Sequence, residues 1–434
     1  MTFETVLVLA AIVFGYGLVS SALGRRSISG PLVFTVAGVL IGPSSLGLID
    51  GSFAEGGVEV LAEATLVLVL FSDATRIDLR ALRSQTTLPL RLLGIGLPLT
   101  VGLGTVVAVL LFDGLTWWEG ALIAAILAPT DAALGQAVVS NPRVPVRVRQ
   151  ALNVESGLND GLMLPAITIL IAAAAAESGI DSTGQWVRFV AEQIGFGVGL
   201  GVLIGWCGGL ALDRVVARGW VDSIMRQLAT LAVAVAAFSA AELTGGNGFV
   251  AAFVAGMAFG YAAEERGESA ADFTEDEGQL LALLTFAFFG ALLLGPRLGD
   301  LSVEVALYAV LSLTVIRMVP VALAMLGVGL EWPTVGYLGW FGPRGLASIL
   351  FGLSVVEEVE LAGSETILEV MTWTVLASIV AHGLTAVPFA NRYADWFAAM
   401  DDDDMAAMPE AEEVAEMRPR QRHAGDEGPG PTAA

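Results

Sequence analysis

Most of the chain consists of apolar segments separated by short polar or Gly/Pro-rich breaks. Runs of about twenty apolar residues recur from Phe3 to Pro388, and each is long enough to cross a hydrocarbon core of roughly 30 Å. Dividing the chain at the breaks predicts about thirteen transmembrane helices, over residues 3–23, 28–47, 58–76, 86–112, 117–140, 150–175, 185–212, 222–242, 245–263, 277–295, 301–326, 333–356 and 366–388. The pattern therefore predicts an all-α polytopic membrane protein.

The arginines between these spans predict how the chain is oriented, because cytoplasmic loops of membrane proteins collect positive charge. Arginines follow spans 1, 3, 5 and 7, at Arg25, Arg26, Arg76, Arg80, Arg83, Arg143, Arg147, Arg149, Arg214 and Arg218. The loops after spans 2, 4, 6, 8 and 12 contain no Arg, and the loop after span 10 contains only Arg297. We therefore expect a multi-pass protein of the cell membrane, with its N-terminus outside and its C-terminus in the cytoplasm.

Composition agrees with a membrane protein and excludes other classes. Of 434 residues, 55% are apolar and only 15% are charged, whereas soluble proteins carry about a quarter charged residues. A water-soluble multidomain enzyme is thereby excluded. The net charge of −23 argues against nucleic acid as a partner, because no excess of cations is available to neutralise phosphates. The single cysteine, Cys207, offers neither a disulfide nor a thiolate-based metal site, and we expect no cofactor.

The kinds of charged residue present suggest a saline habitat. All 21 basic residues are Arg, against 44 Asp and Glu residues. This excess of acids without Lys resembles the proteins of extreme halophiles, and we favour a halophilic archaeon as the source. A GC-rich codon bias is the alternative. It explains the missing Lys, but it explains the excess of acids less well.

Two acidic segments lie outside the predicted spans. Residues 264–277 contain seven acids and one Arg, which predicts a solvated cytoplasmic loop. From Asp401 onward the chain is rich in Asp, Glu, Pro and Gly, with almost nothing to bury, which predicts disorder. We expect a transmembrane domain over residues 1–390 and an acidic, disordered cytoplasmic tail over residues 391–434. A solubilising role for this tail is favoured over partner binding.

Candidate chemistry is restricted to the few ionisable residues within spans, because a charge in hydrocarbon is costly unless it faces a cavity or a partner. In the fifth span, Pro129 lacks an amide proton and clashes with the preceding turn, so the helix should break there. Asp131 would lie beside that break, where free carbonyls and half-helix dipoles suit a small cation. The alternative is a simple kink with Asp131 bonded to neighbouring backbone.

The sixth span contains two carboxylates within two helical turns. Ser156 and Asp160 lie four residues apart on one face of this helix, and Glu155 and Asn159 lie on the adjacent face. Carboxylate oxygens are hard donors that suit Na⁺ or Li⁺, and each carboxylate can take up a proton instead. The pattern predicts one site at which a cation and a proton compete.

The twelfth span has a second Gly/Pro interruption, around Pro343 and Arg344. It lies seven spans after the first break, and an odd offset inverts the orientation in the membrane. Breaks at matching places in oppositely oriented halves indicate an inverted-repeat transporter. We expect the Arg344 guanidinium near the carbonyl ends or carboxylates at the crossing, and Arg317 in the eleventh span is a further intramembrane cation. Three acids against two Arg leave one negative charge for one Na⁺ or H⁺.

Three segments together resemble a known family. They are Ala128-Pro129-Thr130-Asp131, Glu155-Ser156-Gly157-Leu158-Asn159-Asp160 and Gly342-Pro343-Arg344-Gly345. In content, order and membrane placement they are similar to the signature of the monovalent cation:proton antiporters, family 1, which are sodium/proton antiporters of the NhaP and NHE type. The resemblance covers residues 1–390 and leaves out the tail.

The resemblance implies roles for individual residues. Asp160 looks like the ion-binding aspartate, at which Na⁺ and H⁺ compete. Asp131 and Glu155 resemble the other two acids of the Na⁺ site. The further implied ligands and supports are the Ser156 hydroxyl, the Thr130 carbonyl, Asn159, Arg344, Arg317 and Pro129. An Asn at position 159 resembles the electroneutral branch, which exchanges one Na⁺ for one H⁺.

The family fold also implies an assembly and a mechanism. It is a homodimer in the lipid bilayer, with spans 1–3 and 8–10 on the dimer side and spans 4–6 and 11–13 forming a moving core. The expected function is Na⁺ (or Li⁺)/H⁺ exchange by alternating access, and not an enzymatic activity. The sequence does not fix the preferred cation, so a K⁺/H⁺ antiporter of the same fold is an alternative.

Three other functions are compatible with parts of the pattern. An uncoupled cation channel would also use broken helices and intramembrane acids. An intramembrane serine protease would use Ser156 and His382 as a dyad, but the stretch around Ser156 lacks a Gly-x-Ser-x-Gly elbow. His382 is better explained as a hydrogen-bonded polar group. A sensor that does not transport would be expected to have lost one of the acids, and all are present.

Overall fold

The computed structural model describes residues 3–24, 27–49, 57–77, 87–177, 183–358, 361–400 and 408–412, and all regular structure in these ranges is helical. The N-terminal half contains α1 (Phe3–Gly24), α2 (Gly30–Ile41), α3 (Gly57–Thr75), α5 (Thr87–Arg91), η2 (Leu92–Gly96), α6 (Leu97–Leu111), α7 (Trp117–Ile126), α8 (Ala132–Val139), α9 (Val146–Glu177) and α10 (Thr183–Ala217). The remainder contains α11 (Ser223–Thr244), α12 (Gly248–Phe288), η3 (Phe289–Leu294), α13 (Gly295–Arg297), α14 (Val303–Leu313), α15 (Val315–Ala324), α16 (Trp332–Trp340), α17 (Leu346–Glu358), α18 (Ser364–Ala398) and η4 (Pro409–Ala411).

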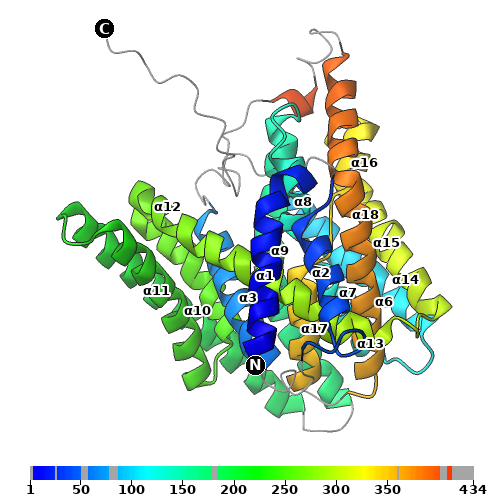
Figure 1. The fold of residues 1–434 in the computed structure, drawn as a ribbon, viewed down its shortest axis with the longest axis horizontal. Helices are drawn as coiled ribbons and strands as arrows, with labels where there is room; N and C mark the ends of the chain where they lie inside the picture. The colour runs from blue at the N-terminus through cyan, green and yellow to red at the C-terminus, as the bar shows by residue number, and fades with distance from the viewer. Residues whose placement is uncertain are drawn as a thin grey trace.

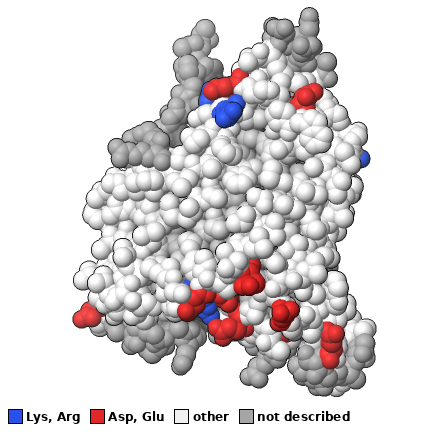
Figure 2. Space-filling model, turned by 90° about the vertical axis from the view of Figure 1, so that its right-hand side faces the viewer, with Lys and Arg blue, Asp and Glu red and all other residues white. Residues whose placement is uncertain are grey.

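The all-helical membrane fold predicted from the sequence is confirmed. Helices occupy each of the thirteen predicted ranges, and eight of the described helices are long and apolar enough to cross a membrane. The total of thirteen crossings stays a prediction, because several other apolar helices are shorter. Figure 2 shows charged side chains mainly at the two ends of one face of the molecule, with a broad band of uncharged residues between them. Such a band suits a hydrocarbon core.

The helices form two groups around the broken spans. Helices α10, α11 and α12 pack on one another and α12 packs on α3, at one side of the molecule (Figure 1). Helices α14, α15, α16 and α18 lie at the other side, where α14 contacts α18 and α15 contacts α16. Helix α9 contacts both α3 and α7. The breaks between α7 and α8 and between α16 and α17 lie inside the helical body, where residues 126–130 and 341–346 are buried.

The segment 264–277, predicted as a loop, is helical in the structure. It belongs to α12, in which every residue from Gly248 to Phe288 has helical backbone. The helix nevertheless reverses direction, because Gly260 packs against Thr75 at one end of α3 while Thr285 lies 3.4 Å from Thr65. A straight helix would separate positions 260 and 285 by about 38 Å, whereas ten residues of α3 span only about 15 Å. The chain therefore turns back between two spans, as predicted. The turning segment is helical with a hydrogen-bonded backbone, and is not an irregular loop.

Two parts of the predicted disordered tail are also ordered. Residues 391–398 continue α18, and residues 408–412 form a short turn that packs against the body of the protein. There the Glu410 carboxylate, which is fully buried, accepts a 2.7 Å hydrogen bond from the backbone N–H of Glu331. Arg147 forms a 2.6 Å ion pair with Glu412. The composition of the tail could not predict these contacts, because each one needs a partner residue far away in the chain. Residues 401–407 and 413–434 lie outside the described ranges.

Glycines let α2 approach the C-terminal part of the α12–η3 segment at backbone distance. A Cβ atom at Gly38 would overlap the Ala287 carbonyl, and one at Gly290 would overlap the Thr35 carbonyl. Small residues at helix interfaces permit this close packing in membranes, where van der Waals contact drives association. These two contacts fix α2 against the segment that follows the reversal of α12.

Candidate ion-binding site

Two broken helices cross at the centre of the protein. Helix α7 ends at Ile126 and α8 begins at Ala132, while α16 ends at Trp340 and α17 begins at Leu346. Both breaks fall at the Gly/Pro interruptions from which they were predicted. The two extended segments are joined where the backbone N–H of Asp131 donates a 2.7 Å hydrogen bond to the Pro343 carbonyl.

The Asp131 side chain caps the half-helix of the opposite break. One of its carboxylate oxygens accepts a 2.9 Å hydrogen bond from the N–H of Leu346, the first residue of α17. A negative charge is favourable at this position, because the N-terminus of a helix carries partial positive charge. Gly345 is required beside it, since a Cβ atom there would overlap the Asp131 carboxylate.

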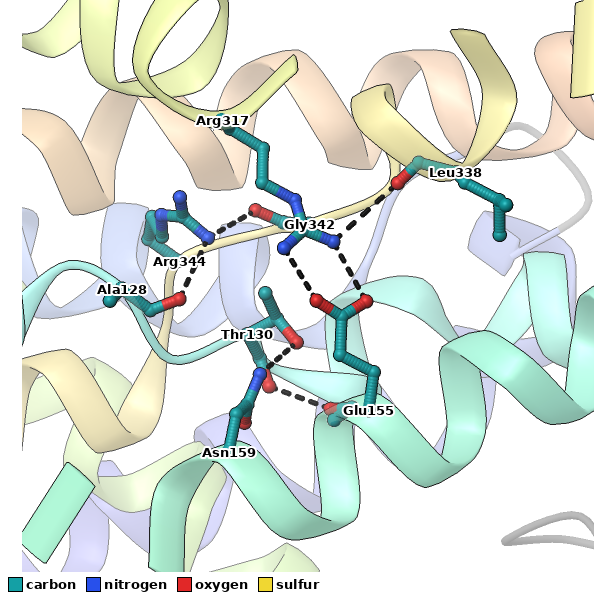
Figure 3. A network of polar contacts seen from close by, with 9 residues as sticks. Ala128, Thr130, Glu155, Asn159, Arg317, Leu338, Gly342 and Arg344 are labelled. Atoms are coloured by element: carbon teal, nitrogen blue, oxygen red, sulfur yellow. Dashed lines mark hydrogen bonds and ion pairs between the residues drawn. The ribbon is translucent and has the colours of Figure 1, made fainter. Parts of the chain in front are cut away.

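Arg344 makes the reciprocal contact with the first break (Figure 3). Its Nη1 donates to the carbonyl of Ala128, just beyond the end of α7, at 3.3 Å, and to the carbonyl of Gly342 at 2.9 Å. The side chain is completely buried. A cation at the carbonyl end of a half-helix offsets its partial negative charge. Asp131 of the first break therefore offsets the positive end of α17, and Arg344 of the second break offsets the negative end of α7.

Helix α9 holds the first break through Thr130. The Ser156 hydroxyl donates to the Thr130 carbonyl at 2.6 Å, and the Asn159 amide donates to the Thr130 hydroxyl at 2.7 Å. Asp160 follows Ser156 by four residues, so it lies on the same face one turn further along. Its side chain is only 7% exposed. Helix α9 thus carries a buried carboxylate one helical turn from the residue that binds the break.

Glu155 and Arg317 form a buried ion pair between α9 and α15. The two guanidinium nitrogens Nη1 and Nη2 donate to the two carboxylate oxygens at 2.5 and 2.8 Å, and both residues are 1% exposed. Arg317 Nη2 also lies 3.5 Å from the Leu338 carbonyl (Figure 3). A bidentate pair of this kind neutralises both charges. The sequence identified both residues but not their pairing.

The structure does not gather the three predicted Na⁺ ligands into one cluster. Within the described ranges, no group of three or more Asp, Glu, His or Cys side chains is placed to hold a metal ion. Glu155 and Asp160 are five residues apart on α9, so their side chains point about 140° apart around the helix. Glu155 is turned to Arg317, and Asp131 to α17. Two acids of the predicted triad are therefore turned to different partners.

His382 on α18 is hydrogen-bonded at both ring nitrogens, as expected for a satisfied polar group. Its Nε2 lies 2.9 Å from the Trp340 carbonyl, and its Nδ1 lies 3.1 Å from the Ser378 hydroxyl. Ser156 is bonded instead to Thr130. Ser156 and His382 therefore have different partners and do not form the dyad that the protease alternative needs. Ser378 was missed by sequence reasoning, although a serine four residues before a buried histidine is a visible signal.

Comparison with known proteins identifies the family. The model of the transmembrane sodium/hydrogen exchanger family matches residues 8–392. The chain belongs to the sodium/hydrogen exchanger family. This family is one of transporters, and the resemblance noted from the three sequence motifs is confirmed. The source organism stays a prediction.

Individual members of the sodium/hydrogen exchanger family are only distantly similar. The Na⁺/H⁺ antiporter ApNhaP of Aphanothece halophytica is 26% identical over 368 residues, which cover 81% of this chain and 68% of that protein. The K⁺/H⁺ antiporter NhaP2 of Shewanella sp. (strain ANA-3) is 24% identical over 379 residues, covering 86% of this chain and 64% of that protein. The chain thus spans only part of the length of these relatives.

The fold of the family is also recognisable in a solved structure. The sodium proton antiporter MjNhaP1 from Methanocaldococcus jannaschii, at pH 8, superposes with a TM-score of 0.73. The two chains are 19% identical, and the match covers 90% of this chain and 98% of the other. At this identity the likeness shows a shared polytopic helical fold.

Proposed function

We propose that this protein exchanges Na⁺ or Li⁺ for H⁺ across the cell membrane. Membership in the sodium/hydrogen exchanger family supports the proposal. The observation that carries it is the buried charge around the helix crossing. Three acids and two arginines contribute, Asp131, Glu155 and Asp160 against Arg317 and Arg344, so three negative and two positive charges leave a net charge of −1.

We assign this net charge to Asp160, because the other charged groups of the centre have partners that offset their charges. Glu155 is neutralised by Arg317 through two hydrogen bonds. Asp131 and Arg344 occupy opposite helix ends at the crossing, where their charges offset the partial charges of the half-helices. One monovalent cation or one proton on Asp160 then makes the centre neutral. Competition between them gives electroneutral exchange, one Na⁺ for one H⁺.

Oxygen atoms next to Asp160 suit a small monovalent cation. The Ser156 hydroxyl and the Thr130 carbonyl lie 2.6 Å apart, one helical turn from Asp160. Hydroxyl, carbonyl and carboxylate oxygens are the donors that hard cations take. We propose that Na⁺ is bound by the Ser156 hydroxyl, the Thr130 carbonyl and the Asp160 carboxylate. Asp131 and Glu155 would have to leave their present partners to become direct ligands.

The coupling rule follows from the cost of moving a charge through hydrocarbon. With Na⁺ or H⁺ bound, the centre is neutral and can move between the outward-facing and inward-facing positions. Without an ion the centre is charged, and its movement through the hydrocarbon core is energetically unfavourable. In this proposal spans 4–6 and 11–13 move against spans 1–3 and 8–10, which form a homodimer in the bilayer. The grouping of helices at two sides of the molecule is compatible with such a division.

Exchange of K⁺ for H⁺ by the same mechanism is the second candidate. It is favoured by the Shewanella relatives, which are K⁺/H⁺ antiporters at an identity similar to that of ApNhaP. An uncoupled cation channel is less well supported, because the family is one of exchangers.

The test is collapse of a pH gradient in vesicles that contain the full-length protein. Na⁺, Li⁺ and K⁺ are added in turn, with and without an imposed membrane potential. We expect dissipation by Na⁺ or Li⁺ that is insensitive to potential and absent in Asp160→Asn. Glu304→Gln is the matched control, since it removes an exposed carboxylate in the first turn of α14. Normal exchange by a folded Asp160→Asn protein would contradict the assignment.

A further inference from the structure

Helix α18 holds the second break with two buried side chains that the proposed function does not use. Ser378 is 0% exposed and His382 is 1% exposed. They lie four residues apart, so they share one face of α18. That face is turned to the end of α16 and to the extended segment that follows it.

Three hydrogen bonds run in series from one edge of the break to the other. The backbone N–H of Arg344 donates to the Ser378 hydroxyl oxygen at 2.6 Å. The Ser378 hydroxyl donates to His382 Nδ1 at 3.1 Å, and His382 Nε2–H donates to the carbonyl of Trp340, the last residue of α16, at 2.9 Å. A neutral ring with its proton on Nε2 satisfies both contacts, because the Trp340 carbonyl can only accept.

The two halves of the protein repeat this arrangement. Helix α9 follows the first break and binds it through Ser156, whose hydroxyl donates to Thr130. Helix α18 follows the second break and binds it through Ser378. In each helix the residue four positions later is ionisable and buried, Asp160 in α9 and His382 in α18. The side chains on α18 therefore occupy the positions of the proposed cation-binding residues of the opposite repeat.

We propose that Ser378 and His382 are positioning residues for cation exchange. They fix the backbone of Arg344 and the end of α16, and thereby hold the Arg344 guanidinium on the Ala128 carbonyl of the first break. Without Ser378 and His382, the contact between Arg344 and the Ala128 carbonyl weakens. The oxygen atoms proposed to bind the cation, at Thr130 and Ser156, then shift from their positions. This inference rests on the proposed function, because it concerns the geometry of the same site.

The experiment compares five full-length proteins in proteoliposomes, namely wild type, Ser378→Ala, His382→Ala, His382→Gln and Thr385→Ala. Thr385 is the matched control because it also binds Trp340 from α18, but through the indole Nε1–H at 3.0 Å and not through the backbone of the break. The apparent KM for Na⁺, the maximal rate and the melting temperature are measured for each.

We expect Ser378→Ala and His382→Ala to raise the apparent KM about five- to tenfold, the effect of losing one buried hydrogen bond. His382→Gln should restore most of this loss, since its side-chain amide can donate to the Trp340 carbonyl. Thr385→Ala should lower the melting temperature without changing the KM.

Three results separate failure of this inference from failure of the proposed function. If the wild type exchanges Na⁺ for H⁺ and the KM is unchanged in Ser378→Ala and His382→Ala, the positioning role is wrong while the function stands. The same conclusion follows if Thr385→Ala raises the KM as much as His382→Ala does. If the wild type exchanges no cation at all, the proposed function itself is wrong.

Discussion

The buried pair of Glu155 and Arg317 allows the net charge of −1 to be tested directly. Glu155→Gln would bring the centre to zero, and Arg317→Met would bring it to −2. The double variant returns it to −1 without the pair. If charge governs binding, the double variant should regain exchange that both single variants lose. If Glu155 is instead an indispensable Na⁺ ligand, the double variant should be as inactive as Glu155→Gln.

The magnitudes follow from the burial and spacing of these residues. Glu155 and Asp160 are five positions apart on α9, which places their Cα atoms about 8–9 Å apart. The two carboxylates lie farther apart than this, because their side chains point to different sides of α9, so at an effective dielectric constant of about 20 removing one charge changes cation binding by at most about 2 kcal/mol, or up to about 30-fold in KM. Both partners are 1% exposed, so removing either one leaves a buried unpaired charge at a cost of about 3–5 kcal/mol.

The assay measures Na⁺-dependent ΔpH collapse and thermal unfolding in parallel. For a chain of this length, an unfolding entropy of about 0.9 kcal/mol/K converts the stability loss into a fall of about 3–6 °C in Tm for each single variant. The double variant should recover at least half of that fall, because no unpaired charge remains. A double variant that is no more stable and no more active than either single variant would refute the reasoning.

Two further predictions concern packing away from the site. Gly38→Val should lower Tm by more than the pair variants do, because its side chain would overlap the backbone at Ala287, whereas Gly94→Val, with open space around its Cα, should not; equal Tm values for the two would contradict this. Glu410→Ala should lower Tm by about 1–3 °C, because it removes a buried acceptor from the N–H of Glu331, and an unchanged Tm would show that the turn at 408–412 does not stabilise the body of the protein.

The positions of the helix breaks could be predicted because their causes are local. Pro129 and Pro343 lack the amide proton that a continuous helix needs, and the Gly residues beside Pro343 disfavour a helical backbone. Both breaks occur where these residues stand. The acids and arginines of the centre were identifiable for a similar reason, since a charged residue in an apolar span must have a special environment.

The partners of those residues could not be predicted from the sequence alone. Arg317 is 162 positions away from Glu155, and no local pattern selects Glu155 over Asp131 or Asp160 as the acid that it binds. The ordered turn around Glu410 was missed for the same reason, because its composition is typical of a disordered tail while its contacts lie elsewhere in the chain. Helix formation across residues 264–277 was missed because dense negative charge was interpreted as a sign of a loop.

The reciprocal placement of Asp131 and Arg344 has a consequence for coupling. Each side chain offsets the partial charge of a half-helix that belongs to the other break. The partial charges at the crossing are therefore balanced by side chains of the crossing itself. In the proposed mechanism, the charge that changes with ion binding is that of the α9 carboxylate Asp160. A centre built in this way can make movement depend on the occupancy of one acid, which is the condition for exchanging one cation for one proton.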